Sequence, residues 1–109
     1  MDCPDAEALA GFYAELLGGE TVYNDGGWVE VGLPTGRPLI AFQRVDGYNR
    51  PKWPSQDVPQ QFHIDVKVDD LDAGEQAVLA IGATKTGDEH PTFRVYLDPA
   101  GHPFCLVTG

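Results

Sequence analysis

The sequence predicts one α+β domain built from two copies of the same half. A helix cap and a helix stop recur at equal spacing: Asp5 precedes Gly18 by thirteen residues, and Asp69 precedes Gly82 by the same distance. A proline–glycine turn also recurs at a displacement of 65 residues. With 109 residues, of which 42% are hydrophobic, the chain has the size of a single domain with one core.

The turn repeat defines the internal boundaries. Pro34-x-Gly36-Arg37-Pro38 returns as Pro99-x-Gly101-His102-Pro103, and the same shift places Trp28 on Phe93. Such self-similarity indicates one supersecondary unit written twice. We therefore expect module one over residues 1–47, a polar connection over 48–60 and module two over 61–109, each in the order βαβββ.

The first half begins with a capped helix. Asp5 offers an N-cap for a helix over 6–17, and Gly18-Gly19 ends it. Strands are expected over 20–23, 28–32 and 39–45, separated by strong turn signals. Only Met1 to Pro4 precede the cap, so the first strand is expected to be short or missing.

The second half begins with a strand that has two unlike faces. Residues 62–68 alternate between apolar and polar side chains, which predicts a half-buried strand. Asp69 or Asp70 caps a helix over 71–81, and strands are expected over 92–97 and 103–108. Ile64, Val66 and Val68 pack under that helix, and the other face carries His63, Asp65 and Lys67.

The composition restricts partners and location. Seventeen acidic and seven basic residues give a net charge of -10, which repels nucleic-acid phosphates. No apolar run reaches the roughly 20 residues that span a bilayer, and no signal pattern is present, so we expect no membrane partner and a cytoplasmic protein. Cys3 and Cys105 lie outside any CxxC motif, so we expect free thiols, with a bridge between them as the alternative.

Three segments resemble a known superfamily. They are Phe12-Tyr13-x-x-Leu16-Leu17-Gly18, the run from Phe62-His63-Ile64-Asp65 to Leu71-Asp72, and Asp98-Pro99-Ala100-Gly101-His102-Pro103-Phe104-Cys105-Leu106. Together they resemble the glyoxalase/bleomycin-resistance (vicinal oxygen chelate) superfamily. The stretch from Trp53-Pro54 to Phe62-His63 further resembles its glyoxalase-like subgroup.

The resemblance implies a fold and two alternative chemistries. The fold has paired βαβββ modules around a cleft, and many members are homodimers. Enzymatic members hold a divalent metal with His and Glu from the first and last strands of each module. Members of the bleomycin-resistance type sequester a drug without a catalytic metal.

The metal ligands implied by the resemblance are incomplete in this chain. His63 is the only candidate in a ligand position, and Cys105 stands where metal-binding members carry Glu. By the internal repeat, the module-one counterpart of Cys105 is Ile40. The module-one counterpart of His63 would precede Met1. Because a catalytic metal takes about three protein ligands, a site would need Asp65, His90, His102 or a partner subunit to complete it. His102, in a turn, is expected at the surface.

Alternative roles remain open for both central residues. His63 fits a cleft histidine hydrogen-bonded to a neighbour, a metal ligand, or a general acid or base. Cys105 fits a small buried side chain, a metal ligand, or a nucleophile paired with His63.

Trp53 lies in the polar connection, where it plugs the core edge, enters a dimer interface or covers the cleft. The predicted ligand-binding residues are His63, Asp65, Cys105, Ile40, Phe42 and Trp53.

The sequence thus favours a metal-independent small-molecule-binding protein that acts as a homodimer. Its ligand is expected to be flat and apolar, and a cationic one suits the acidic chain. The alternatives are a metal-dependent lyase, isomerase or dioxygenase that uses His63, and an accessory domain that has lost ligand binding. Whether the chain is an enzyme stays open at this point.

Overall fold

The computed structural model describes residues 1–35 and 39–108 and divides into two units, Met1–Asn49 and Arg50–Gly109. Each unit holds one helix and one four-stranded sheet, which confirms the predicted α+β class. Residues Gly36, Arg37 and Pro38 of the predicted turn repeat lie outside the described residues.

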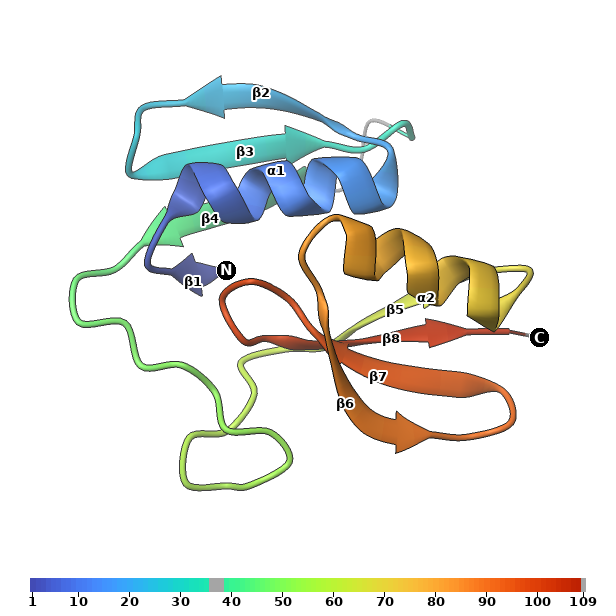
Figure 1. The fold of residues 1–109 in the computed structure, drawn as a ribbon. Coiled ribbons are helices and arrows are strands. Elements are labelled where there is room, and N and C mark those ends of the chain that lie inside the picture. Colours follow the sequence, from blue (N-terminus) through green and yellow to red (C-terminus); the bar gives the residue numbers. More distant parts are fainter. Residues whose placement is uncertain (36–38, 109) are drawn as a thin grey trace. The chain divides into compact units, whose positions relative to one another are not determined.

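The first unit contains β1 (Asp2–Cys3), α1 (Ala6–Leu17), β2 (Glu20–Asn24), β3 (Trp28–Gly32) and β4 (Leu39–Arg44). Its sheet has the order β1-β4-β3-β2, with β1 parallel to β4 and the other neighbours antiparallel. The first strand is short, as predicted, with two residues. Figure 1 shows α1 running along one face of this sheet.

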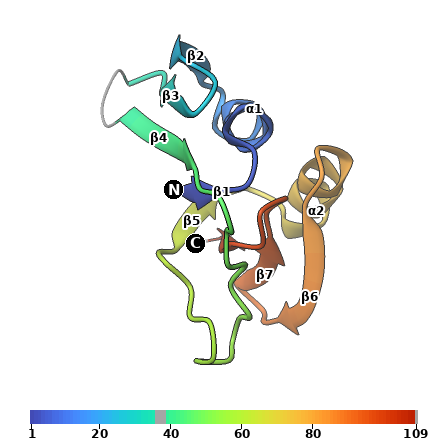
Figure 2. The same ribbon diagram turned by 90° about the vertical axis from the view of Figure 1, so that its left-hand side faces the viewer.

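Helix α1 forms as the sequence predicts. The Asp5 carboxylate accepts a hydrogen bond from the backbone N–H of Ala8 at 3.0 Å, and Gly18 ends the helix in the left-handed region at φ 67°. Tyr13, on the buried side of the helix, stacks on Phe42 with ring centroids 5.6 Å apart. The core of this unit therefore lies between α1 and the sheet, as the end-on view of the helix in Figure 2 illustrates.

The second unit repeats the arrangement. It contains β5 (Ile64–Lys67), α2 (Leu71–Ala80), β6 (Thr84–Glu89), β7 (Phe93–Leu97) and β8 (Pro103–Val107), with sheet order β5-β8-β7-β6. Its first strand again runs parallel to its last, and the other neighbours are antiparallel. The same βαβββ order occurs twice, as expected.

The cap of α2 differs from one detail of the predicted repeat. Asp70, not Asp69, is the N-cap: its carboxylate accepts from the backbone N–H groups of Asp72 at 2.8 Å and Ala73 at 3.1 Å. The C-cap of α2 is Ile81, not Gly82, so its two caps are eleven residues apart, against thirteen from Asp5 to Gly18. The predicted equality of the two spacings was therefore wrong, because either of two adjacent aspartates is a suitable cap by residue type.

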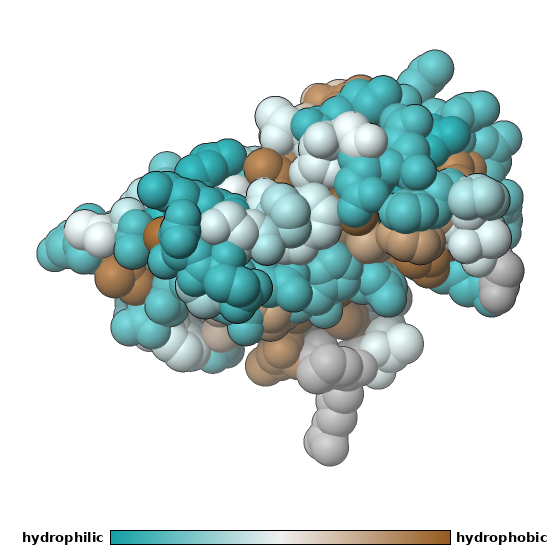
Figure 3. Space-filling view, turned by 90° about the horizontal axis from the view of Figure 1, so that it is seen from below, coloured by the Kyte–Doolittle hydropathy of each residue, from teal (hydrophilic) through white to brown (hydrophobic). Residues whose placement is uncertain are grey.

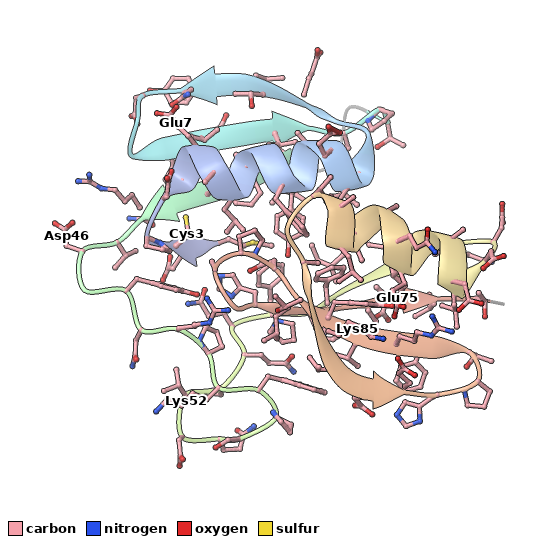
Figure 4. All side chains as sticks on the ribbon, viewed as in Figure 1. Cys3, Glu7, Asp46, Lys52, Glu75 and Lys85 are labelled. Atoms are coloured by element: carbon pink, nitrogen blue, oxygen red, sulfur yellow. The ribbon has the colours of Figure 1, made fainter. Side chains whose placement is uncertain are left out.

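The core of the second unit lies under α2. The largest fully buried side chains there include Tyr96, Phe104 and Leu106. The Tyr96 hydroxyl donates to Glu75 of α2 at 2.9 Å, and Lys85 of β6 pairs with the same Glu75 at 3.4 Å, a pairing that can be followed in Figure 4. These polar contacts tie the helix to the far strands of its sheet.

Most of the predicted connection belongs to the second unit. The backbone N–H of Lys52 donates to Val58 at 2.8 Å, and the Arg50 guanidinium donates to the Pro99 carbonyl at 3.3 Å. The Arg50 side chain lies so close over Gly101 that a Cβ there would come within 2.5 Å of it. Gly101 also has φ +90°, so this turn requires glycine.

Hydrophilic residues predominate in the view of Figure 3. Within residues 1–35 and 39–108, neither helix has the length and apolar character needed to cross a bilayer.

Candidate functional site

Three potential metal ligands or proton carriers meet at one point of the second unit. His63 directly precedes β5, Asp65 follows two residues later, and Cys105 lies on β8. The Nε2 atom of His63 lies 3.2 Å from the Cys105 Sγ and 3.2 Å from the Asp65 Oδ1. One ligand atom from each residue falls within 4.8 Å of the others. We call these three residues the His63 cluster.

Strand alternation and register bring the cluster together. Asp65 and Cys105 are directly paired in the parallel β5–β8 ladder, so their side chains leave the same face of the sheet. The side chains of Val66 and Val68 leave the other face of the sheet, and Val68 lies beside Gly74 of α2. The alternation predicted for residues 62–68 is thus confirmed, although the strand itself begins at Ile64 and leaves His63 just before it.

The imidazole of His63 is held from both sides. Its Nδ1 lies 3.2 Å from the Gln60 Oε1. Its Nε2 faces the thiol and the carboxylate. The side chains of His63 and Asp65 are 29% and 62% exposed, whereas Cys105 is buried, so the cluster opens to solvent on its imidazole and carboxylate side.

The Cys105 thiol is a poor nucleophile in this setting. Burial raises the pKa of Cys105 to about 11, and the negative charges of Asp65 and Asp88 add to the shift. Near neutral pH the sulfur therefore remains a protonated thiol, 3.2 Å from the His63 Nε2. A nucleophilic cysteine needs the opposite shift, so this arrangement does not support a Cys–His nucleophile.

The other two histidines lie outside the cluster. His90 pairs with Asp88 at 2.7 Å and stacks on Phe93, with ring centroids 4.2 Å apart. His102 is fully buried, with its ring 5.9 Å from that of Phe62. The expected surface position of His102 was wrong, because the turn that carries it folds inward.

Two of the predicted cleft-wall residues face the core of the first unit. Phe42 is fully buried against Tyr13 of α1. Ile40, two residues earlier on β4, pairs with the buried Val31 and lies on the same side of the sheet. Their assignment to an open ligand-facing wall is thereby corrected. Trp53 is half-buried in the segment 50–60, and its role stays a prediction.

Strand pairing also corrects the internal repeat. Trp28 pairs with Gln43, whereas Phe93, its repeat counterpart, pairs with Val107. Counting back two residues from Gln43 on β4 and from Val107 on β8 makes Ala41, not Ile40, the first-unit equivalent of Cys105. A methyl group coordinates no metal, so this position of the first unit still offers no ligand.

The first unit carries an aromatic and acidic surface that was not predicted from the sequence. Trp28 and Tyr23 are 38% and 49% exposed, and Tyr23 pairs with Glu30 in the β2–β3 ladder. The Trp28 indole N–H donates to the Glu30 carboxylate at 2.9 Å. Since Val29 and Val31 of β3 are buried under α1, these three side chains occupy the opposite face. We call Tyr23, Trp28 and Glu30 the aromatic face. The alternation of β3 was the signal that could have revealed it.

Two βαβββ units, each with its helix on one sheet face, define the fold class of the vicinal oxygen chelate superfamily. The chain belongs to the glyoxalase-like domain family, whose model matches residues 1–107. No curated protein matches the chain.

Solved structures agree on the fold. A glyoxalase/bleomycin resistance protein/dioxygenase family enzyme from Burkholderia phytofirmans aligns with a TM-score of 0.69 and 19% identity, covering 99% of this chain and 93% of that one. The fosfomycin resistance protein FosX from Listeria monocytogenes aligns with a TM-score of 0.73 and 15% identity, covering 100% and 88%. A glyoxalase-related enzyme from Fulvimarina pelagi aligns with a TM-score of 0.69 and 19% identity, covering 100% and 85%.

The side chains present fit a divalent ion only in part. In a site that took ligands from both modules, the last-strand position of the first unit would be Ala41, and that of the second would be the protonated thiol of Cys105. The second unit by itself, however, brings imidazole, carboxylate and thiol donors together.

Proposed function

We propose that this protein binds a small molecule without a resident metal, as a sequestering member of the glyoxalase/bleomycin-resistance superfamily. The observation that supports this proposal is the pair of side chains at the last-strand positions of the two units. Cys105 carries a thiol whose pKa is raised to about 11, and the corresponding position of the first unit is Ala41. Neither offers the carboxylate with which metal-binding members hold their ion.

Recognition would rest on aromatic contact and negative charge. The indole of Trp28 and the phenol of Tyr23 offer exposed ring surface beside the Glu30 carboxylate. A cation over such a ring gains about 0.5–2 kcal/mol, and the net charge of -10 adds long-range attraction. A planar aromatic cation is the ligand class that fits best.

A homodimer is part of the same proposal. Edge strand β2 is exposed along its whole length, and Val22 is 54% exposed there. An exposed, partly apolar edge favours strand pairing with another chain. Sedimentation equilibrium is expected to give twice the monomer mass, and Val22→Lys is expected to weaken the association; a monomer at all concentrations would contradict this part.

The proposed binding is tested with acriflavine, a planar cation, and with the planar anion fluorescein as the control. We expect acriflavine to quench tryptophan fluorescence saturably, with unchanged affinity in the presence of EDTA, and Trp28→Ala to weaken binding at least tenfold. Equal binding of fluorescein, or no saturable binding of either dye, would overturn the proposal.

A metal-dependent enzyme is the second candidate. The observation that favours it is the convergence of the His63 cluster within 4.8 Å. In that case His63 would hold a divalent ion that polarises substrate oxygens, as expected of a lyase, isomerase or dioxygenase. Loss of acriflavine binding on chelation, together with a stoichiometric divalent ion in the purified protein, would favour this candidate over the first.

A further inference from the structure

We propose that the planar cation held at the aromatic face carries an aliphatic chain, and that this chain lies in an apolar hollow farther along the same sheet. The inference rests on the proposed function, because it concerns another part of the same ligand. It narrows the ligand class to a cationic amphiphile, a planar aromatic cation with one aliphatic substituent. Both the hollow and the aromatic face belong to the first unit.

The hollow lies over a glycine of β3. It has a volume of about 430 Å³, and its lining includes Glu20, Val22, Gly32, Leu33, Pro34 and Leu39. A Cβ added to Gly32 would lie 3.1 Å from the Val22 Cγ1 and 3.8 Å from the Leu39 Cδ2. Two aliphatic side chains, one from β2 and one from β4, therefore flank a position that has no side chain of its own.

The hollow lies on the side of the sheet that carries the aromatic face. The two valines of β3 are buried under α1. Because side chains alternate along a strand, Gly32 lies on the other side, together with Trp28 and Glu30. Leu39 is the antiparallel partner of Gly32, so its side chain leaves the sheet on that side too. One ligand can therefore contact both features.

The spacing along β3 sets the length of the chain. Glu30 and Gly32 are two residues apart, which corresponds to about 7 Å along a strand. An extended chain advances about 1.2 Å per single bond, so a substituent of roughly six carbons reaches from a ring beside Glu30 to Gly32. A methyl group on the same ring is too short to enter the hollow.

The walls of the hollow offer apolar surface that a ligand can remove from water. Val22 and Leu39 are 54% and 52% exposed. Single exposed aliphatic residues are common, but these two border one hollow and share it with Leu33 and Pro34. Each methylene group buried there is expected to strengthen binding by about fourfold.

The charges beside the hollow favour a cationic amphiphile over an anionic one. Glu20 is the antiparallel partner of Gly32 in the β2–β3 ladder, so its side chain leaves the sheet beside the hollow. Glu30 lies between the hollow and Trp28 along β3. A fatty acid or an alkyl phosphate would bring its negative head group close to these carboxylates, in a chain of net charge -10.

The experiment compares N-methyl and N-nonyl acridine orange, which share one planar cation and differ in the length of the aliphatic chain. The fluorescence anisotropy of each dye is followed while the protein is added, at dye concentrations too low for self-association. We expect the N-nonyl dye to bind at least tenfold more tightly than the N-methyl dye. Dodecanoylaminofluorescein, a planar anion with an aliphatic chain, is expected to bind at least tenfold more weakly than the N-nonyl dye.

Matched variants locate the chain. Gly32→Val fills the hollow with two methyl groups, and Leu39→Ser removes one of its walls. Each is expected to lower the ratio of the N-nonyl to the N-methyl affinity at least fivefold. The control Leu79→Ser changes a leucine of α2 that is 38% exposed, and it is expected to alter this ratio less than twofold. Circular dichroism of each variant confirms that it is folded.

Three results would overturn the inference: equal affinities of the two acridine dyes, equal changes of their ratio in Leu39→Ser and Leu79→Ser, or equal binding of the anionic amphiphile. Saturable acriflavine binding that depends on Trp28 would leave the proposed function standing in the first two cases. Absence of saturable binding for acriflavine and for both acridine orange dyes would overturn the proposed function and the inference together.

Discussion

Replacing Phe42 with alanine separates a core role from a ligand-facing role for this ring. The side chain is fully buried and stacks on Tyr13 at a centroid distance of 5.6 Å. Truncation of a buried phenylalanine costs about 3–5 kcal/mol, because apolar contact is lost and a cavity remains. Since small domains have a total stability of about 5–15 kcal/mol, we expect a large fall in the urea midpoint of Phe42→Ala.

The matched control is Trp28→Ala, which removes an aromatic ring of the same sheet from its exposed face. We expect this variant to lose less than about 1 kcal/mol in the same urea titration, since surface changes are usually small. Phe42→Leu keeps most of the volume and is expected to lose less than Phe42→Ala, so a measurable midpoint survives. Equal losses for Phe42→Ala and Trp28→Ala, or a Phe42→Ala cost below about 1 kcal/mol, would refute the burial of this ring beneath α1.

Four further outcomes are expected. Asp70→Ala should lower the free energy of unfolding by about 1 kcal/mol through loss of the α2 cap, whereas Asp69→Ala should change it by less than half as much; urea titration tests the order. At pH 9, in a Cys3→Ser background, the fraction of Cys105 present as thiolate should be about fiftyfold lower than at the pKa of about 11, so iodoacetamide labelling should rise steeply with pH. Because the unfolded thiol titrates near 9.0 and the folded one near 11, this group's contribution to native stability is lost as pH rises through that window, and alkaline urea titrations check the sign. Gly101→Ala should lower the thermal midpoint, since φ +90° and a contact of 2.5 Å leave no room for a methyl group; an unchanged midpoint would contradict this account.

Local signals in the sequence predicted much of the fold. The helix over 6–17 was found with its bounds, because Asp5 and Gly18 each satisfy a specific backbone requirement. Strand β6 was implied only by the repeat, since its sequence, Thr-Lys-Thr-Gly-Asp-Glu, lacks the apolar alternation of a half-buried strand. Its stability comes from pairing with β7, which composition does not reveal.

The site was predicted in part for a related reason. Alternation along one strand places His63 and Asp65 on one face, and the structure confirms this arrangement. The choice between Ile40 and Ala41 depends on register between strands, where a shift of one residue moves each side chain to the other face. Sequence repeats carry no such register, so the first-unit side chains were assigned to the wrong face.

The parallel pairing of β1 with β4 and of β5 with β8 has a consequence for protein engineering. In each half, the strand that starts the unit lies beside the strand that finishes it. Because the two strands are parallel, Ile64 lies beside Phe104 and Lys67 beside Val107, so a linker from the end of β8 to the start of β5 has to run back along the ladder. With such a linker, new termini could be opened at a hairpin tip without breaking the ladder. A permuted second half opened between β6 and β7 would keep the strands that carry Asp65 and Cys105 adjacent.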